Sequence, residues 1–173
     1  MAGMLVLLAS SLSMSQPPAE ARSLNTPQTM DMSLYCPVRS ALDQMGLDLG
    51  NLPNDNNGGV PSSYQIPREI ADDASWVQVF AWIFSGNSPP SVQRIYRFTS
   101  EWRPYEPIHY YLYSYGYPQG AISYNSDNFW LPVPVSGQIQ IARSGPRWTT
   151  NWNSSVRITG YLRKHRGLRC RSV

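Results

Sequence analysis

The second half of this chain consists of short runs of β-branched and aromatic residues that alternate with turn-forming clusters. From Ser75 to Leu162, segments rich in Val, Ile, Phe, Tyr and Trp are separated by groups of Gly, Pro, Asn and Ser, and no sustained helical period interrupts them. About six or seven short strands at such regular spacing are typical of antiparallel sheets. We therefore predict an all-β fold, a single antiparallel β-sandwich or jelly roll.

The first 21 residues have the pattern of a secretory signal peptide. A short apolar run is followed by small residues and by Ala19-Glu20-Ala21, which fits a cleavage site. The run is too short to span a bilayer, since a membrane helix needs about 20 apolar residues. It lacks the usual positive charge before the apolar run, so a buried N-terminal segment is the alternative. We expect residues 1–21 to be a signal peptide and the protein to be secreted and extracellular.

Three further segments follow the signal-like one. Residues 22–63 are expected to form an N-terminal extension, with a short helix over 34–45, where apolar residues recur at helical spacing, and an Asn/Gly/Pro-rich loop after it. Residues 64–162 hold the predicted β-sandwich domain, and the 42% hydrophobic content of the chain suffices for one core. Residues 163–173 form a basic C-terminal tail.

The positive charge of the chain is concentrated in this tail. It holds five of the fourteen Lys and Arg residues, whereas residues 22–162 hold nine of them against ten acids. Nucleic-acid binding by the folded body would need a basic face, so we expect no nucleic-acid partner. The candidate polyanion-binding residues are Arg163, Lys164, Arg166 and Arg169. The alternatives for this segment are a solvated disordered end and an Arg-x-x-Arg site of secretory-pathway proteolysis.

Two cysteines, Cys36 and Cys170, flank the β-rich region. In an oxidising compartment a disulfide between them would stabilise the fold by about 5 kcal/mol in the chain-entropy model. A covalent link between subunits and two unrelated thiols are the alternatives. Two cysteines with no matching histidines do not make a tetrahedral zinc site. We expect no cofactor and no metal, apart from a low-specificity calcium option at Asp72, Asp73 and Asp127.

Hydrophobic alternation assigns faces to individual strands. Residues 76–84 are apolar at odd and even positions, which predicts a strand covered on both faces. Residues 92–98 carry Arg94 and Arg97 among apolar side chains, which predicts partial exposure. In residues 154–162 the predicted core-facing side chains are Val156, Ile158 and Leu162, and the predicted outward ones are Arg157, Thr159 and Tyr161.

Residues 129–135 are predicted to form an edge strand. Their odd-numbered members are apolar and are expected to face the core, whereas Pro132 and Pro134 remove two hydrogen-bond donors from one side of the strand. The polar residues 125–128 predict a turn before this strand. Residues 136–137, Ser-Gly, predict a two-residue hairpin after it.

A tyrosine-rich stretch, residues 110–117, supplies the candidate ligand-binding surface. Even positions there are expected to face the core, so the odd ones, together with His109, form an outward aromatic row. Rigid rings with a polar tip are common in sugar-binding sites and paratopes. A subunit interface and a structural ladder of cross-strand pairs are alternatives of equal weight. The candidate ligand-binding residues are Tyr111, Tyr113, Tyr115, Tyr117, Trp130, Asn125 and Asp127.

These features predict a secreted, non-enzymatic β-sandwich that acts in adhesion. It would bind glycan or an extracellular protein, or assemble into a homo-oligomer, through its aromatic face. No catalytic residue is assigned, because His109 and His165 stand in no nucleophile motif. The alternatives are a membrane-active protein, pore-forming or lipid-binding, and, third, a glycoside hydrolase-like enzyme with paired carboxylates. Asn153 begins an N-glycosylation triplet, as expected of a secreted glycoprotein.

Overall fold

The computed structural model describes residues 30–39, 46–54, 60–86, 93–103, 106–115, 122–145, 152–167 and 169–170. The predicted signal peptide lies outside these residues. Within the described ranges the chain forms nine β-strands and two short helices. In chain order they are η2 (Met32–Leu34), β1 (Tyr35–Pro37), β2 (Leu47–Gly50), β3 (Ser62–Gln65), α1 (Arg68–Ala71), β4 (Ala74–Gly86), β5 (Gln93–Arg103), β6 (Glu106–Tyr115), β7 (Ile122–Pro132), β8 (Gln138–Ser144) and β9 (Trp152–Arg163).

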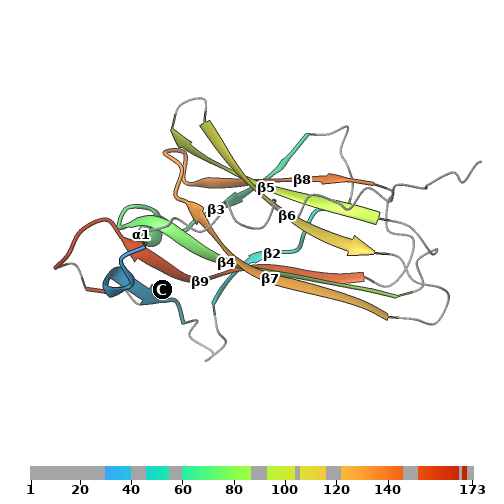
Figure 1. Ribbon diagram of the computed structural model, residues 1–173, viewed down its shortest axis with the longest axis horizontal. Helices are drawn as coiled ribbons and strands as arrows, with labels where there is room; N and C mark the ends of the chain where they lie inside the picture. The colour runs from blue at the N-terminus through green and yellow to red at the C-terminus, as the bar shows by residue number, and fades with distance from the viewer. Residues whose placement is uncertain are drawn as a thin grey trace, which may run out of the picture.

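The strands form two antiparallel sheets that stack face to face (Figure 1). The five-stranded sheet has the order β1-β9-β4-β7, and β2 also pairs with β9. The four-stranded sheet has the order β3-β8-β5-β6. This arrangement confirms the predicted all-β antiparallel sandwich. The described residues hold more strands than the sequence predicts, because β1, β2 and the first half of β3 come from residues 22–63, which were expected to lie outside the sheets.

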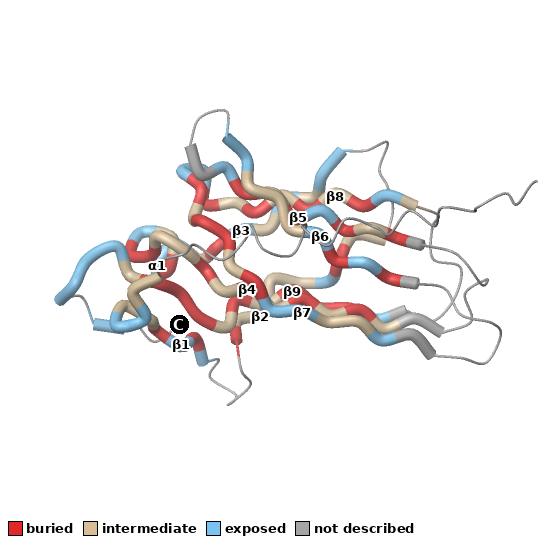
Figure 2. Tube along the Cα trace, viewed as in Figure 1, coloured by how far each residue is buried: buried red, intermediate tan, exposed pale blue. Residues whose placement is uncertain are grey.

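Alternating side chains from both sheets fill the space between them, and buried and partly exposed positions follow one another along the strands (Figure 2). Full burial of one such aliphatic or aromatic side chain contributes about 1.5–3 kcal/mol, so these rows dominate the stability. On β4 the inner row is at most 1% exposed and consists of Val77, Val79, Ala81 and Ile83. On β5 and β8 the corresponding row is fully buried and consists of Tyr96, Phe98, Ile139 and Ile141.

One aromatic cluster joins the two sheets. The ring of Phe129 on β7 stacks on Tyr110 of β6, with centroids 3.7 Å apart and planes 8° apart. The same ring meets Phe98 of β5 edge-on at 4.8 Å. Such pairs contribute about 0.5–1.5 kcal/mol beyond their burial, so they fix the edge of one sheet against the other.

A register shift in β9 reverses the predicted orientation of Tyr161, whereas Leu162 is buried at 4% exposure, as predicted. Gly160 and Ile158 pair with consecutive residues of β4, so Thr159 is an extra residue in the ladder. An extra residue in one strand inverts the alternation beyond it. Tyr161, predicted to point outward, is therefore fully buried, whereas Val156 and Ile158 face the core as predicted.

The strand β7 lies at an edge of the five-stranded sheet, as its prolines predict. The predicted turn at residues 125–128 is wrong, because these residues pair with residues 80–83 of β4 in the middle of the strand. Their polar side chains favour a turn only locally. At the edge of a sheet such polar side chains can contact solvent while the backbone pairing of the strand continues.

The chain crosses from one sheet to the other after β7. The Gly137 N–H donates to the Pro134 carbonyl at 2.9 Å, which closes a turn, and β8 then joins the four-stranded sheet. The predicted hairpin at residues 136–137 is therefore wrong, although a turn does lie there. Val135, predicted to face the core, is fully exposed at this turn.

The predicted helix over 34–45 is wrong at its start. Residues 35–37 form β1, which pairs with the end of β9, while residues 40–45 lie outside the described ranges. Pairing with β9 and the covalent anchor at Cys36 outweigh the helical spacing of a few apolar residues. The described part of residues 22–63 therefore belongs to the sandwich, and the predicted domain start at residue 64 is too late.

Cys36 and Cys170 form a disulfide that spans 134 residues, which confirms the predicted pairing. The chain leaves β9 at Arg163 and turns back at Gly167, whose φ of 97° favours glycine. The turn returns the basic tail to β1. A loop of this length corresponds to about 5 kcal/mol in the chain-entropy model.

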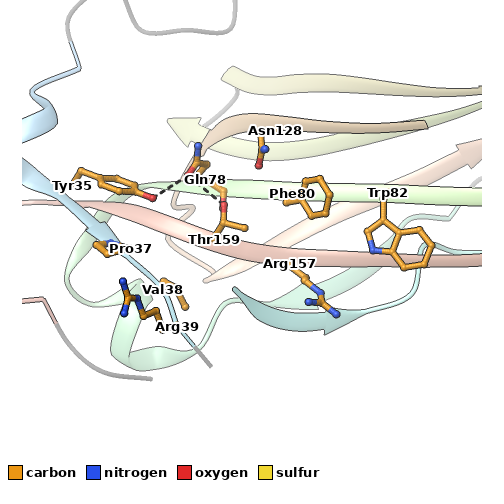
Figure 3. Close-up of a pocket in the computed structure, with 10 residues that line it drawn as sticks. All are labelled: Tyr35, Pro37, Val38, Arg39, Gln78, Phe80, Trp82, Asn128, Arg157 and Thr159. Carbon is orange, nitrogen blue, oxygen red and sulfur yellow. Dashed lines mark hydrogen bonds between the residues drawn. The ribbon is translucent and has the colours of Figure 1, made fainter. Parts of the chain in front are cut away.

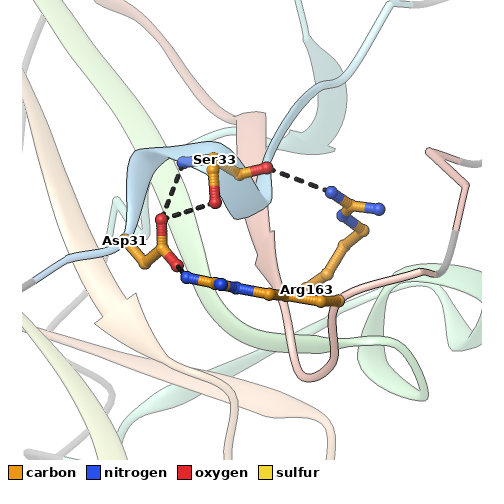
Figure 4. A network of polar contacts seen from close by, with 4 residues as sticks. Asp31, Ser33 and Arg163 are labelled. Carbon is orange, nitrogen blue, oxygen red and sulfur yellow. Dashed lines mark hydrogen bonds and ion pairs between the residues drawn. The ribbon is translucent and has the colours of Figure 1, made fainter.

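Polar contacts hold the tail against the residues before β1 (Figure 4). The Arg166 guanidinium pairs with the Asp31 carboxylate at 2.7 Å, and Arg163 Nη2 donates to the Ser33 carbonyl at 3.1 Å. The Ser33 hydroxyl and N–H donate to Asp31 at 2.6 and 3.0 Å. Hydrogen bonds from Ser33 and then from Arg166 lower the pKa of Asp31 to about 2.

Candidate functional site

A groove of about 790 Å³ lies on the outer face of the five-stranded sheet (Figure 3). The strand β4 forms its floor, β7 and β9 flank it, and β1 with the two residues that follow closes one end. The lining residues are Tyr35, Pro37, Val38, Arg39, Gln78, Phe80, Trp82, Asn128, Arg157 and Thr159.

The floor of the groove is made by the even-numbered residues of β4. Because the odd-numbered residues face the core, Gln78, Phe80 and Trp82 point outward. All three are partly exposed. The prediction that residues 76–84 are covered on both faces is therefore wrong for the outer face, which presents aromatic rings to solvent.

Tyr35 lies across one end of the groove. Its hydroxyl donates to Gln78 Oε1 at 3.3 Å, and its ring meets Trp130 edge-on with centroids 6.1 Å apart. The Thr159 hydroxyl donates to the same oxygen at 3.2 Å, so the Gln78 amide is held by two partners. Gly160 permits this arrangement, because a Cβ at that position would overlap the Tyr35 ring.

The other end of the groove continues to the edge of the sheet. Trp82 stacks on Tyr124 of β7, with centroids 6.3 Å apart and planes 26° apart. Tyr124 is 61% exposed. The outer face of this sheet therefore carries a band of rings that runs from Tyr35 past Phe80 to Tyr124.

The charges at the groove are positive. Arg39 and Arg157 are its charged lining residues, and none of the ten carries a carboxylate. Arg157 Nε donates to the Ser155 hydroxyl at 3.1 Å, and that hydroxyl donates in turn to Asp48 Oδ1 at 3.2 Å. Asp48 faces Arg157 across the β2–β9 ladder, and its Oδ1 also accepts the Gly50 N–H at 2.9 Å.

The predicted ligand-binding residues do not form one site. Tyr111 and Tyr113 point outward from β6, as predicted, and are 44% and 38% exposed at the edge of the four-stranded sheet. Trp130 lies on the outer face of the other sheet, beside Tyr35. The Tyr115 side chain and Tyr117 lie outside the residues that the structure describes.

Asn125 and Asp127 link the sheets instead of facing a ligand. The Tyr110 hydroxyl donates to the Asp127 carboxylate, and the Asn125 amide donates to the Tyr113 carbonyl. Both contacts bridge β7 and β6, which lie in different sheets. These polar side chains therefore close the open side of the sandwich.

The predicted polyanion-binding residues are mostly engaged within the molecule. Arg163 and Arg166 hold the residues before β1, and Lys164 Nζ donates to the Ala71 and Asp72 carbonyls at 3.2 and 2.9 Å. Arg169 is exposed. The tail from Arg163 to Gly167 is thus a structural clamp, not the solvated disordered end considered from the sequence.

Arg94 of β5 is more buried than its sequence pattern predicts, whereas Arg97 on the same strand is exposed. Arg94 is 1% exposed and lies on the inner face with Arg143, which is 4% exposed. Burial lowers the pKa of Arg94, and the charge of Arg143 lowers it further. On the outer face, burial and then the charge of Arg97 lower the pKa of His109, whose Nδ1 lies 2.9 Å from the Thr99 hydroxyl.

The three carboxylates of the calcium option are not brought together. Asp72 and Asp73 precede β4, whereas Asp127 pairs with Ala81, about 23 Å further along the strand at 3.3 Å per residue. Among the described residues, no group of three His, Cys, Asp or Glu side chains is placed to hold a metal ion. Asn153, the glycosylation candidate, is exposed on β9.

Comparison with protein-family models and with curated proteins finds no match for this chain. No helix in the described ranges has the length and apolar character needed to cross a membrane.

Sequence reasoning missed the groove, although one signal for it was present. The even-numbered apolar residues of 76–84 were expected to be covered by other parts of the protein, whereas the structure leaves them partly exposed. The polar residue Gln78, at an outward position between Trp76 and Phe80, marked this face as a surface.

Proposed function

We propose that this protein is a secreted, non-enzymatic β-sandwich module that binds glycan on the outer face of its five-stranded sheet. The observation that carries the proposal is the pair of partly exposed rings, Phe80 and Trp82, side by side on the floor of a groove with polar walls. The C–H faces of sugars pack on aromatic rings, and amide groups bond their hydroxyls. Gln78 and Asn128 supply such amides at the groove.

The rigidity of the groove supports binding over a purely structural role. Phe80 and Trp82 stand on β4, which is paired on both sides by β7 and β9. The Gln78 amide oxygen is fixed by Tyr35 and Thr159, and its amide nitrogen makes no hydrogen bond with the described residues. Side chains that are already ordered lose little conformational entropy when a ligand binds.

Two observations support a secreted location. The Cys36–Cys170 disulfide is typical of oxidising compartments. The apolar run and the Ala19-Glu20-Ala21 pattern at the start of the sequence are typical of secretory signals. Mass measurement of protein recovered from a eukaryotic culture medium tests both, since cleavage after Ala21 and oxidation of the two thiols have defined masses.

Association of copies through the same aromatic band is the second candidate function. Tyr124, 61% exposed, extends the band to the edge strand β7, and exposed aromatic surface often marks protein interfaces. Pro132 at the end of this strand limits edge-to-edge pairing. Association would therefore proceed face to face, with the rings of Trp82 and Tyr124 in the contact.

A glycan-array screen combined with sedimentation tests both candidates. The wild-type protein is compared with Phe80→Ala and Trp82→Ala, which remove the floor of the groove, and with Tyr111→Ala, which removes an exposed ring from the other sheet. Glycan binding should fall about tenfold or more in the first two variants and persist in the third. Thermal melting of each variant separates lost binding from lost folding. A monomer at micromolar concentration that binds no glycan would refute both candidates.

A further inference from the structure

We infer that the groove selects an acidic glycan, with uronic-acid carboxylates of two sugar units of one chain bound by Arg157 and by Arg39. This inference rests on the proposed function and adds to it the chemical class of the ligand. It is carried by two guanidinium groups in an aromatic groove that holds no carboxylate among its lining residues.

Arg157 is held in position by its own sheet. It pairs with Phe80 in the β4–β9 ladder, so its side chain emerges beside the aromatic floor. Its Nε is fixed by the Ser155 hydroxyl at 3.1 Å, and its two terminal nitrogens make no hydrogen bond with the described residues. A guanidinium that is held at Nε presents those two nitrogens together, in the geometry that grips a carboxylate with two parallel hydrogen bonds.

The acid opposite Arg157 in the β2–β9 ladder does not occupy its terminal nitrogens. Asp48 faces Arg157 across the ladder, yet the two make no ion pair, and the Ser155 hydroxyl lies between them as a bridge. The same carboxylate accepts the Gly50 N–H. Asp48 therefore orients Arg157 through Ser155 and leaves the two terminal nitrogens of Arg157 without a carboxylate partner among the described residues.

Arg39 supplies a second cation at the end of the groove that β1 closes. It is exposed, follows β1, and makes no hydrogen bond or ion pair with the described residues. Figure 3 shows Arg39 towards one end of the groove, Trp82 at the other and Arg157 between them. Two separated positive charges beside stacked rings match a chain with one charge per sugar, as in a uronan, better than a densely sulfated one.

The groove is tested with oligogalacturonate and its methyl ester, which share the sugar ring but differ in the charge of the carboxyl group. By titration calorimetry at low and moderate salt, the acid should bind at least about tenfold more tightly than the ester, and salt should weaken only the acid. Arg157→Gln should lose this preference, and Arg157→Lys should restore only part of it because lysine has no planar fork. Arg97→Gln, an equal charge change on the other sheet, is the control and should bind as the wild type does.

Other outcomes overturn the inference in distinguishable ways. Equal binding of acid and ester, dependent on Phe80, would leave a glycan site and refute its acidic preference. If a heparin hexasaccharide bound more tightly than oligogalacturonate, the group recognised would be a sulfate and not a carboxylate. If a single-stranded oligothymidylate bound more tightly, the ligand would be a nucleic acid and not a glycan. Silence towards every glycan would refute the proposed function itself.

Discussion

The two outer faces of the sandwich are built from strands of the same type, but they present different chemistry. The four-stranded sheet carries a polar ladder in which Ser63 and Gln140 bond each other at 3.1 Å, and Gln138 bonds Gln65 at 3.2 Å. The five-stranded sheet carries the rings of Phe80 and Trp82. Beside them, the Gln78 amide nitrogen and the terminal nitrogens of Arg157 donate no hydrogen bond to the described residues. Amides that bond one another offer few hydrogen bonds to a ligand, whereas rings beside unpaired donors offer both apolar contact and hydrogen bonds.

The aromatic residues on the four-stranded sheet sharpen the contrast. Tyr111 and Tyr113 are among the most exposed rings of the described residues, yet they stand in a single row along the edge strand β6. The rings of the other sheet come from β1, β4 and β7 and surround a groove. Exposure alone therefore does not identify a site. A site is indicated where rings from several strands converge.

The largest expected effect comes from breaking the disulfide. Four groove residues lie on β1 or directly after it, next to Cys36, whereas the four-stranded sheet has no covalent anchor among its described residues. Cys36→Ser combined with Cys170→Ser should lower the free energy of unfolding by about 2–5 kcal/mol, measured by urea denaturation. Hydrogen exchange should rise in β1 and the end of β9 and change little in β5 and β6.

A change in exchange that is uniform over both sheets would contradict this difference. The control is the wild-type protein in reducing buffer, which should behave as the double variant does, since it lacks the same bond.

The next effect is expected at Gly160, where the Tyr35 ring lies against the outer face of the five-stranded sheet. Gly160→Ala places a Cβ against the Tyr35 ring and should destabilise the protein by about 1–3 kcal/mol. Denaturation of a double-mutant cycle with Tyr35→Ala is the measurement. If the clash is the cause, the alanine should cost less than about 1 kcal/mol in the Tyr35→Ala background. An equal cost in both backgrounds would assign the effect to the backbone instead.

A smaller effect is expected from the tyrosines of the other face. Tyr111→Ala and Tyr113→Ala remove cross-strand contacts with Arg97 and Ile95 in the β5–β6 ladder. Each should cost about 0.2–1 kcal/mol in thermal or urea unfolding and leave glycan binding unchanged. Loss of binding in either variant would move the site to the four-stranded sheet and reverse the comparison.

The smallest effect is the acid response of the clamp beside β1. The pKa of Asp31 is lowered from 3.8 to about 2 in the folded protein, so its contribution is present above pH 4 and is lost as the pH falls towards 2. Proteolysis of the tail should therefore accelerate over that range. Arg166→Gln should bring faster cleavage already at neutral pH, and Arg169→Gln, an exposed tail residue without this contact, is the matched control. A tail that is equally protected at pH 2 and pH 6 would contradict the role of the ion pair.

The sequence predicts the layers of this protein well and the groove on its outer face poorly, for a physical reason. Alternation reports which side of a strand is apolar, and it correctly assigns Val156 and Ile158 to the core. A proline lacks the backbone N–H that pairs with a neighbouring strand, which predicts an edge position, and β7 is an edge strand as predicted. Both signals are local. The inward turn of Tyr161, by contrast, depends on one extra residue in the ladder, which no periodicity reveals.

The groove depends on contacts between segments that are far apart in the chain. Tyr35 and Arg39 come from a stretch whose apolar spacing predicts a helix, and they reach the site only because β1 pairs with β9. Phe80 and Trp82 are apolar, so local rules bury them. Whether another layer covers them is a property of the whole topology, which is also why Asn125 and Asp127, typical turn residues, end as bridges between sheets.

The bond between Cys36 and Cys170 has a consequence for how the molecule withstands damage. The two cysteines are 134 residues apart in the sequence, so every connection between the strands from β2 to β9 lies inside one covalent ring. A single cut by a protease in any of these connections opens the ring without releasing a fragment. The two pieces stay tethered and paired, and they part only when a reductant follows the protease.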